Sequence, residues 1–176
     1  CCNTGFSALH LALISLNLNH NDEVIIPSFS NVANIQTILN LNLIPVFCDV
    51  NNDTFCIDEN ELQKKVTSKT KVIMFIDYGC NLANYDSIKK ISKNNNLHVI
   101  HDAAHSFGSK FKGKYIGSIF DMTMFSFDPI KTITSIDGGA LILKSKSKYH
   151  KLLRIRNMGI SEDNSYSKNK RSKKRD

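Results

Sequence analysis

The chain has 176 residues, of which 41% are hydrophobic, and a formal net charge of +7 at pH 7. This composition suffices for one substantial core, and no apolar run approaches the roughly 18 residues that a membrane-spanning helix needs. The charge is uneven, because residues 1–143 carry 11 Lys and Arg against 13 Asp and Glu, whereas residues 144–176 carry 12 against 3. No nucleic-acid motif accompanies this basic end, so it indicates a solvated helix face and loop. We therefore expect neither a membrane nor a nucleic-acid partner.

The five cysteines follow no pattern of metal ligands or disulfides. They are Cys1, Cys2, Cys48, Cys56 and Cys80, with no Cys-x-x-Cys spacing and no histidines at ligand intervals. The sequence thus predicts no metal site and no disulfide bond, and the cytoplasm is the compartment that fits best. The chain starts without Met or a signal-peptide pattern and stops in a lysine-rich run, so we expect it to be truncated at both ends.

Residues 6–18 have the leucine spacing of a helix that faces a core, with a stripe made by Leu9, Leu13 and Leu16. The entry to this helix, from Thr4 to Ser7, has one glycine and two small hydroxyl residues. The free backbone N–H groups at such a helix start form a candidate anion site. Plain N-capping by Thr4 is the alternative.

The next segments alternate between strand and helix patterns. Apolar runs at residues 23–29, 44–50, 71–77 and 97–105 predict strands, whereas residues 30–41, a segment opened by Asp58, and residues 84–93 predict helices. The strand runs are apolar on both faces, which is typical of parallel strands covered by helices on both sides. The sequence therefore predicts an α/β fold, a three-layer α/β/α arrangement with a mostly parallel central sheet.

Asp102 directly follows an apolar run and precedes two alanines. Its carboxylate is expected at the edge of the sheet, where the small neighbours leave room for a flat ligand. A carboxylate in that place needs a positive partner, although a turn-capping Asp is the alternative. His105 is a candidate to hydrogen-bond or stack on the same ligand.

The stretch FSFDPIKTITSIDGG at residues 125–139 carries the second chemical signal. Residues 121–127 predict a buried strand that Pro129 ends, so Lys131 is expected at the sheet rim, where ligands of open α/β folds bind. Partial burial there would favour the neutral amine, which attacks carbonyls to form Schiff bases. The glycines at 138 and 139 would let the backbone approach a ligand closely or turn with positive φ before the next strand, GALIL. An ordinary solvated loop lysine is the alternative.

Five segments, in this order, resemble the DegT/StrS-type pyridoxal-phosphate-dependent sugar aminotransferases of the aspartate aminotransferase (type I) fold. They are GFSALHLAL, DEVIIPSF, PVFCDV, VIHDAAHSFGSKFKGKYIGS and FSFDPIKTITSIDGGAL. The resemblance implies that residues 1–160 form a truncated large domain that binds pyridoxal phosphate (PLP). Residues 161–176 would then be a basic, flexible tail that leads to a missing C-terminal part.

Carried over by position, the resemblance implies that Lys131 binds the cofactor covalently. Asp102 would pair with the pyridine nitrogen, and Ser126 would offer its hydroxyl to the phosphate. An anionic Asp102 would keep the pyridine ring protonated, so that the ring withdraws electrons from the reacting carbon. Lys131 would carry the substrate Cα proton as general base and then as general acid.

The resemblance also implies roles for the helix start and for His105. Gly5, Phe6 and Ser7 would bind the phosphate, the last two through their backbone N–H groups. His105 stands where the family has Gln or His near the phenolic oxygen of the cofactor. Asn31 stands where the family has an aromatic residue stacked on the cofactor, so stacking is expected to come from elsewhere.

The resemblance implies an enzyme that moves an amino group, from L-glutamate, to a keto group of a nucleotide-diphosphate sugar. Because dehydratase relatives have histidine in place of the lysine, Lys131 favours transamination. We expect a cytoplasmic homodimer when the protein is full length, and an inactive fragment when the 176 residues stand alone. Two alternatives stay open, a type I PLP enzyme that acts on an ordinary amino acid and a non-catalytic regulatory protein that retains the fold.

Overall fold

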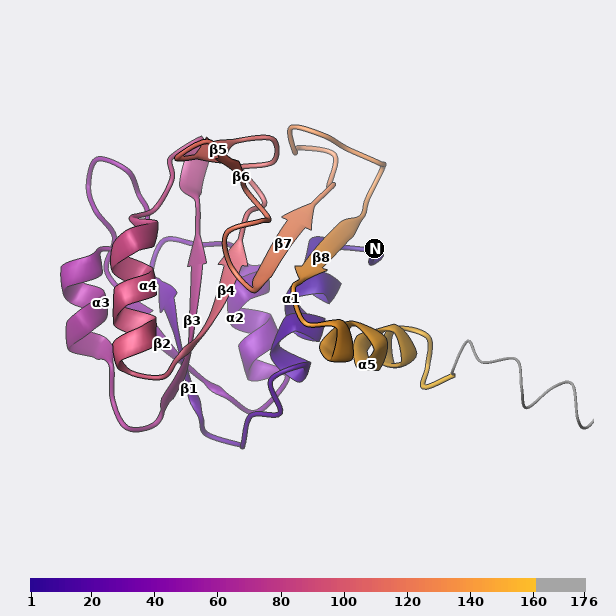
Figure 1. Cartoon of the computed structure of the whole chain (residues 1–176), viewed down its shortest axis with the longest axis horizontal. Coiled ribbons are helices and arrows are strands. Elements are labelled where there is room, and N and C mark those ends of the chain that lie inside the picture. The colour runs from indigo at the N-terminus through magenta and orange to yellow at the C-terminus, as the bar shows by residue number, and fades with distance from the viewer. Residues whose placement is uncertain (161–176) are drawn as a thin grey trace, which may run out of the picture. The chain divides into compact units, whose positions relative to one another are not determined.

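A computed structural model describes residues 1–160 (Figure 1). The chain divides into two compact units, Cys1–Lys144 and one that begins at Ser145. The first unit contains helices α1 (Gly5–Ile14), α2 (Val32–Leu39), α3 (Glu59–Lys65) and α4 (Tyr85–Asn94) and the short 3-10 helix η1 (Tyr78–Cys80). Its strands are β1 (Glu23–Pro27), β2 (Ile44–Cys48), β3 (Thr70–Ile76), β4 (His98–Asp102), β5 (Lys110–Phe111), β6 (Lys114–Tyr115), β7 (Met122–Ser126) and β8 (Gly139–Leu143).

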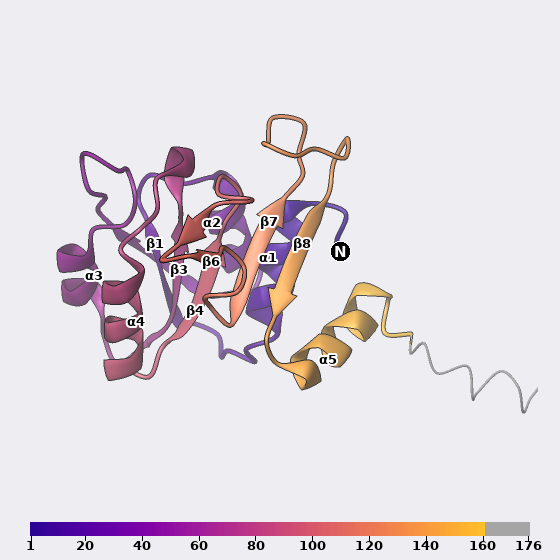
Figure 2. The same cartoon turned by 45° about the horizontal axis from the view of Figure 1, so that its top comes forward.

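Six of these strands form one sheet in the order β2-β1-β3-β4-β7-β8. Every neighbouring pair is parallel except β7 and β8, which are antiparallel. Helices α1 and α2 cover one face of the sheet, and α3 and α4 cover the other (Figures 1 and 2). The predicted three-layer α/β/α fold with a mostly parallel sheet is confirmed.

The two faces of the sheet have separate hydrophobic cores, because successive side chains of a strand point to opposite faces. Ile73 and Phe75 of β3 pack with residues of α3 and α4. Val72 and Met74 of the same strand pack with α1 and α2. Full burial of one such side chain contributes about 1.5 to 3 kcal/mol, so β3 stabilises both layers at once.

Two helices have boundaries that differ from the predicted ones, because of local capping and turns. The first helix ends at Ile14 rather than at residue 18, and Asn17 then takes a positive φ of 52°. Helix α2 begins two residues later than predicted, because the Asn31 side chain accepts the Ala33 N–H at 2.9 Å. The capping role of Asp58 is confirmed, since its carboxylate accepts the N–H groups of Asn60 and Glu61 at 2.7 and 3.1 Å.

The N-terminal segment pairs with the start of β8. The Cys2 N–H donates to the Gly139 carbonyl at 2.7 Å, and the Gly139 N–H donates to the Cys2 carbonyl at 3.0 Å. A Cβ atom at Gly139 would overlap the Thr4 carbonyl, so this close approach requires glycine. The close approach at Gly139 is thus made by the chain's own N-terminal segment, which brings the start of α1 beside the end of β7 and the start of β8.

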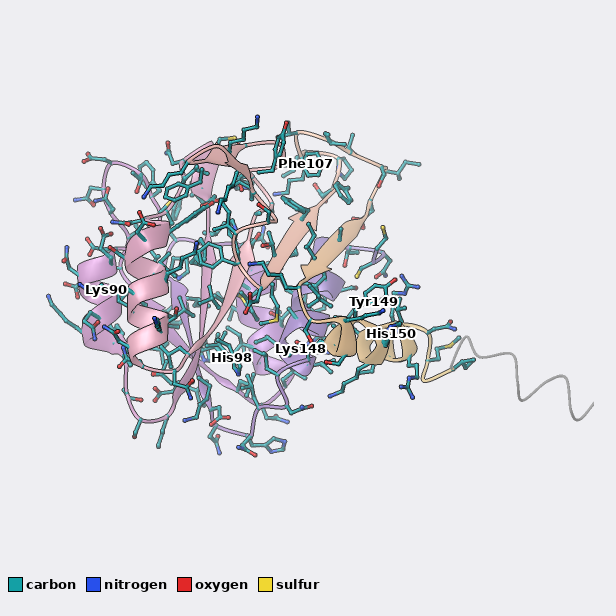
Figure 3. The ribbon with its side chains drawn as sticks, in the orientation of Figure 1. Lys90, His98, Phe107, Lys148, Tyr149 and His150 are labelled. Atoms are coloured by element: carbon teal, nitrogen blue, oxygen red, sulfur yellow. The ribbon has the colours of Figure 1, made fainter. Side chains whose placement is uncertain are left out.

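The second unit contains helix α5 (Lys146–Arg156), from which Lys148, Tyr149 and His150 are labelled in Figure 3. The Ser145 hydroxyl caps it by accepting the Lys148 N–H at 3.3 Å. A helix in this basic region was predicted, whereas the predicted flexible tail at 161–176 lies outside the described residues. Among residues 1–160, no helix has the length and apolar character needed to cross a membrane.

Candidate active site

A cavity of about 280 Å³ opens where the parallel strands β3, β4 and β7 end. Its walls come from the starts of α1 and α2, the ends of these strands, and the loop from β7 to β8. Six predicted site residues line it: Gly5, Phe6, Asp102, His105, Ser126 and Lys131. The carboxyl ends of parallel strands are the usual place for ligands in open α/β folds, because loops and helix starts converge there.

Asp102 is 2% exposed at the end of β4. One carboxylate oxygen accepts the Asn34 amide N–H at 3.0 Å, and the other accepts the Ala104 backbone N–H at 3.0 Å. Burial raises the pKa of Asp102, and these two hydrogen bonds only oppose that effect. No ion pair to Asp102 occurs among residues 1–160, so the site favours a ligand that brings a cationic N–H group.

Asn34 is a site residue that the sequence interpretation missed. It is fully buried in the first turn of α2, donates to Asp102, and lines the cavity. Its carbonyl Oδ1 has no hydrogen-bond partner among the described residues. A signal was present, because Asn34 precedes the buried Ile38 by four residues and so shares its helix face, where an unpaired amide is costly.

The His105 ring is held by the loop that follows β3. Its Nδ1 accepts the Gly79 N–H at 3.2 Å, and the Tyr78 ring packs edge-on against it at a centroid distance of 5.3 Å. Burial lowers the pKa of His105, and the positive charge of nearby Lys131 lowers it further. The imidazole is therefore neutral at pH 7, and because Nδ1 is an acceptor, its proton lies on Nε2.

Lys131 is half-buried in the loop from β7 to β8. Its backbone N–H donates to the Asp128 carbonyl at 2.9 Å, and the Phe127 N–H donates to the Gly138 carbonyl at 2.9 Å across the base of the loop. The Phe107 ring, labelled in Figure 3, packs edge-on against Phe127 with a distance of 5.9 Å between the ring centroids. These contacts place Lys131 in the cavity wall rather than in open solvent.

The start of α1 packs directly on the end of β7. A Cβ atom added at Gly5 would lie 3.0 Å from the Ser126 Cβ and 3.1 Å from its Oγ, so glycine permits this contact. Helix geometry leaves the Gly5 and Phe6 N–H groups without intrahelical acceptors. Ser7 differs, because its N–H donates to the Thr4 hydroxyl at 3.0 Å and it does not line the cavity. The Ser7 N–H is therefore engaged in N-capping by Thr4, which was the alternative to a phosphate site. The phosphate role of Gly5 and Phe6 stays a prediction.

Asn31 lines the cavity and caps α2, so its side chain is already engaged there. Two of the lining residues carry rings, Phe6 and His105. A flat ligand in this cavity has these two rings as its candidates for stacking.

The model of the DegT/DnrJ/EryC1/StrS aminotransferase family matches residues 1–174. The chain belongs to this family. GDP-perosamine synthase of Escherichia coli O157:H7 is 36% identical over 162 residues, which are 92% of this chain and 44% of that protein. The resemblance seen in the sequence is thereby confirmed.

Two solved structures of similar proteins extend the comparison. Helicobacter pylori PseC, an aminotransferase involved in the biosynthesis of pseudoaminic acid, matches with a TM-score of 0.87 and 30% identity over 92% of this chain and 44% of that one. The PLP-form of Spr1654, a putative sugar aminotransferase from Streptococcus pneumoniae, matches with a TM-score of 0.79 and 31% identity over 87% of this chain and 44% of that one. The chain spans less than half the length of these relatives.

Proposed function

We propose that this chain is the cofactor-binding part of a PLP-dependent aminotransferase that acts on a nucleotide-diphosphate sugar. One observation carries the proposal: a fully buried carboxylate, Asp102, and a half-buried lysine, Lys131, line the same cavity beside the start of α1. Structural ion pairs do not explain Asp102, since it has none among residues 1–160, and its pKa is raised by burial. The PLP-form of a relative with the same fold supports this choice of cofactor.

The residues present fit PLP group by group. Asp102 would hold the ring nitrogen, because a protonated pyridine supplies the cationic N–H that the buried carboxylate lacks. Gly5 and Phe6 would offer backbone N–H groups to the phosphate, and Ser126 its hydroxyl. His105, with its proton on Nε2, would donate to the phenolic oxygen.

PLP, when bound, supplies the electron sink for the carbanion that forms when an amino donor loses its Cα proton. Lys131 Nζ accepts that Cα proton as general base and returns a proton as general acid. Asp102, as an anion, would hold the ring nitrogen protonated. The loop from β7 to β8 and the α1 start exclude part of the solvent from these groups.

The proposed substrates are supported by the names of the relatives and by one aromatic surface. The relatives' names point to sugar nucleotides, and glutamate is the amino donor that we propose. Next to His105, three partly exposed aromatic rings meet: Phe29 and Tyr78 at 4.5 Å, and Phe29 and Phe55 at 5.7 Å between centroids. Such rings offer flat apolar faces on which a sugar or base can pack.

A homodimer and a cytoplasmic location belong to the same proposal. Ile130, Ile133 and Ile136, in the Lys131 loop, are 85%, 49% and 90% exposed. A second copy of the chain that covered these side chains would remove apolar surface beside the site from contact with water, which favours association. Cys48, Cys56 and Cys80 carry free thiols, which fits a reducing compartment.

The test uses the complete encoded polypeptide, loaded with PLP. We expect borohydride to fix the cofactor on Lys131 by peptide mass mapping, and L-glutamate to yield its keto acid in proportion to bound cofactor. Transfer to a keto group of a nucleotide-diphosphate sugar but not to simple 2-oxo acids supports the sugar substrate. Preference for 2-oxo acids would favour an ordinary amino-acid enzyme, and absence of cofactor binding would favour a regulatory protein.

A further inference from the structure

A buried polar cluster lies beneath the candidate site, on the face of the sheet that α3 and α4 cover. Its members, which we call the Asp77 cluster, are fully buried side chains from four segments: Asp77, Tyr85, His101 and Ser106. His101 belongs to this face because its ring stacks on Phe75 at 4.5 Å, whereas Asp102 faces Asn34 of α2. None of the four lines the cavity.

Asp77 is the centre of the cluster. One of its oxygens accepts hydrogen bonds from the Tyr85 hydroxyl at 2.5 Å, His101 Nε2 at 2.7 Å and the Ser106 hydroxyl at 2.8 Å. Its other oxygen accepts the Ala83 N–H at 3.1 Å. Burial would raise the pKa of Asp77, but hydrogen bonding and charge from His101, then Tyr85 and Ala83, outweigh burial and lower it. The group is therefore a buried carboxylate with four donors.

Two members of the cluster flank the segment that carries the site. His101 immediately precedes Asp102, and Ser106 immediately follows His105. The same strand end makes two further contacts, since the Asp77 N–H donates to the Asp102 carbonyl at 3.3 Å and the Gly79 N–H donates to His105 Nδ1 at 3.2 Å. The segment from Asp102 to His105 is thus tied at both ends to one carboxylate.

We propose that Asp77 is a positioning residue for the candidate active site. By binding His101 and Ser106, it fixes the orientation of the Asp102 carboxylate on the opposite face of the sheet and of the His105 imidazole beyond the end of β4. Residues 101 and 102 are neighbours in β4 with side chains on opposite faces, so a change of the backbone at residue 101 also moves the side chain of residue 102. Displacement of catalytic groups by about 1 Å costs up to about a hundredfold in rate.

A carboxylate suits this task better than an amide or an apolar group. Both oxygens of Asp77 accept hydrogen bonds, three at one and one from the Ala83 N–H at the other, so the NH2 group of an Asn in this place would face at least one donor. Asp77 also acts through its charge. Asp77 and Asp102 both raise the pKa of His105, whereas Lys131 lowers it. Loss of the charge therefore shifts His105 further toward the neutral form.

The main test is Asp77→Asn in the complete encoded polypeptide, with kinetics that rest on the proposed function. We expect kcat for amino transfer to fall by about ten- to hundredfold, with KM for glutamate changed by less than about threefold. In ¹⁵N-histidine NMR of the cofactor-free protein, the His105 titration is expected to move to lower pH. Ile88→Val, a methyl deletion in the same core without a polar contact, is the stability control and is expected to leave both readouts unchanged.

A matched pair keeps the test valid if Asp77→Asn does not fold. Ser106→Ala and Tyr85→Phe each remove one hydroxyl that donates to the same Asp77 oxygen, but only Ser106 directly adjoins the segment that carries the site. We expect Ser106→Ala to lower kcat more than Tyr85→Phe at equal loss of stability. Equal kcat per folded molecule in both variants, or an unshifted His105 titration in Asp77→Asn, would overturn the proposal.

The two proposals fail in different ways. A wild-type protein without aminotransferase activity refutes the proposed function, while the NMR titration and tautomer of His105 still test Asp77. A wild-type protein with full activity whose Asp77→Asn variant turns over normally refutes the positioning role alone.

Discussion

Replacement of Asp102 by Asn separates what this residue does for catalysis from what it costs in stability. The carboxylate is 2% exposed and has two neutral donors, Asn34 and Ala104. Two unit charges about 4 Å apart, at an effective dielectric constant of about 20, attract each other by about 4 kcal/mol. If the amide loses that attraction to the protonated ring in the transition state, the rate falls about a thousandfold.

The same change is expected to stabilise the cofactor-free protein at neutral pH. Because burial raises the pKa of Asp102 above the ordinary value of 3.8, the folded state holds this proton more tightly than the unfolded state. Stability from this group is then present below pH 3.8 and is lost as pH rises from there through the folded pKa. The amide of the Asp102→Asn variant cannot titrate, so the variant escapes the loss.

The assay combines urea unfolding with turnover of the complete encoded polypeptide. From about pH 4 upward, the free energy of unfolding of Asp102→Asn should rise relative to wild type and then level off. Added PLP should stabilise wild type more than the variant. Asp53→Asn, which removes an exposed carboxylate, is the control for loss of one charge. Near-normal turnover in Asp102→Asn, or no pH-dependent difference in unfolding, would refute this reasoning.

Three further changes test other parts of the site. Lys131→Ala should abolish borohydride fixation of PLP and lower turnover by more than about a thousandfold, and a label on Lys110, Lys112 or Lys114 in wild type would contradict the assignment. Gly139→Ala should lower the free energy of unfolding in urea by about 1 to 3 kcal/mol and weaken PLP binding, because the added Cβ displaces the Thr4 carbonyl. Unchanged affinity for PLP would show that the start of α1 does not bind the phosphate. Asn34→Ala should lower kcat by about tenfold, since Asp102 loses a donor, and wild-type kcat would make Asn34 a packing residue.

The sequence predicted the layers and the two principal site residues because both depend on local patterns. Apolar runs of strand length between helical segments define a parallel sheet wherever they occur along the chain. Asp102 and Lys131 each follow such a run, so their place at the carboxyl edge follows from the strand itself. The structure brings both to one cavity, as expected for that edge.

Boundaries and chain direction were less predictable. The GALIL strand could be recognised, but its antiparallel pairing with β7 depends on how the Lys131 loop closes through Phe127 and Gly138. The β5–β6 hairpin has strands of two residues each, too short for any periodic signal. Capping by Asn31 and Thr4 sets where the two helices start. Capping by Thr4 also engages the Ser7 N–H, unlike the N–H groups of the two residues before it.

The sequence by itself determined the fold class, the edge of the sheet at which ligands bind, and the chemical types gathered there. Only the tertiary structure decided that Asn34 reaches Asp102 across 68 positions, and that Asp77 joins His101 and Ser106 beneath the site. The physical reason is that a hydrogen bond requires its two atoms within about 3 Å. Secondary-structure periodicity specifies which face a residue occupies, whereas strand order and helix packing specify which distant residue it meets there.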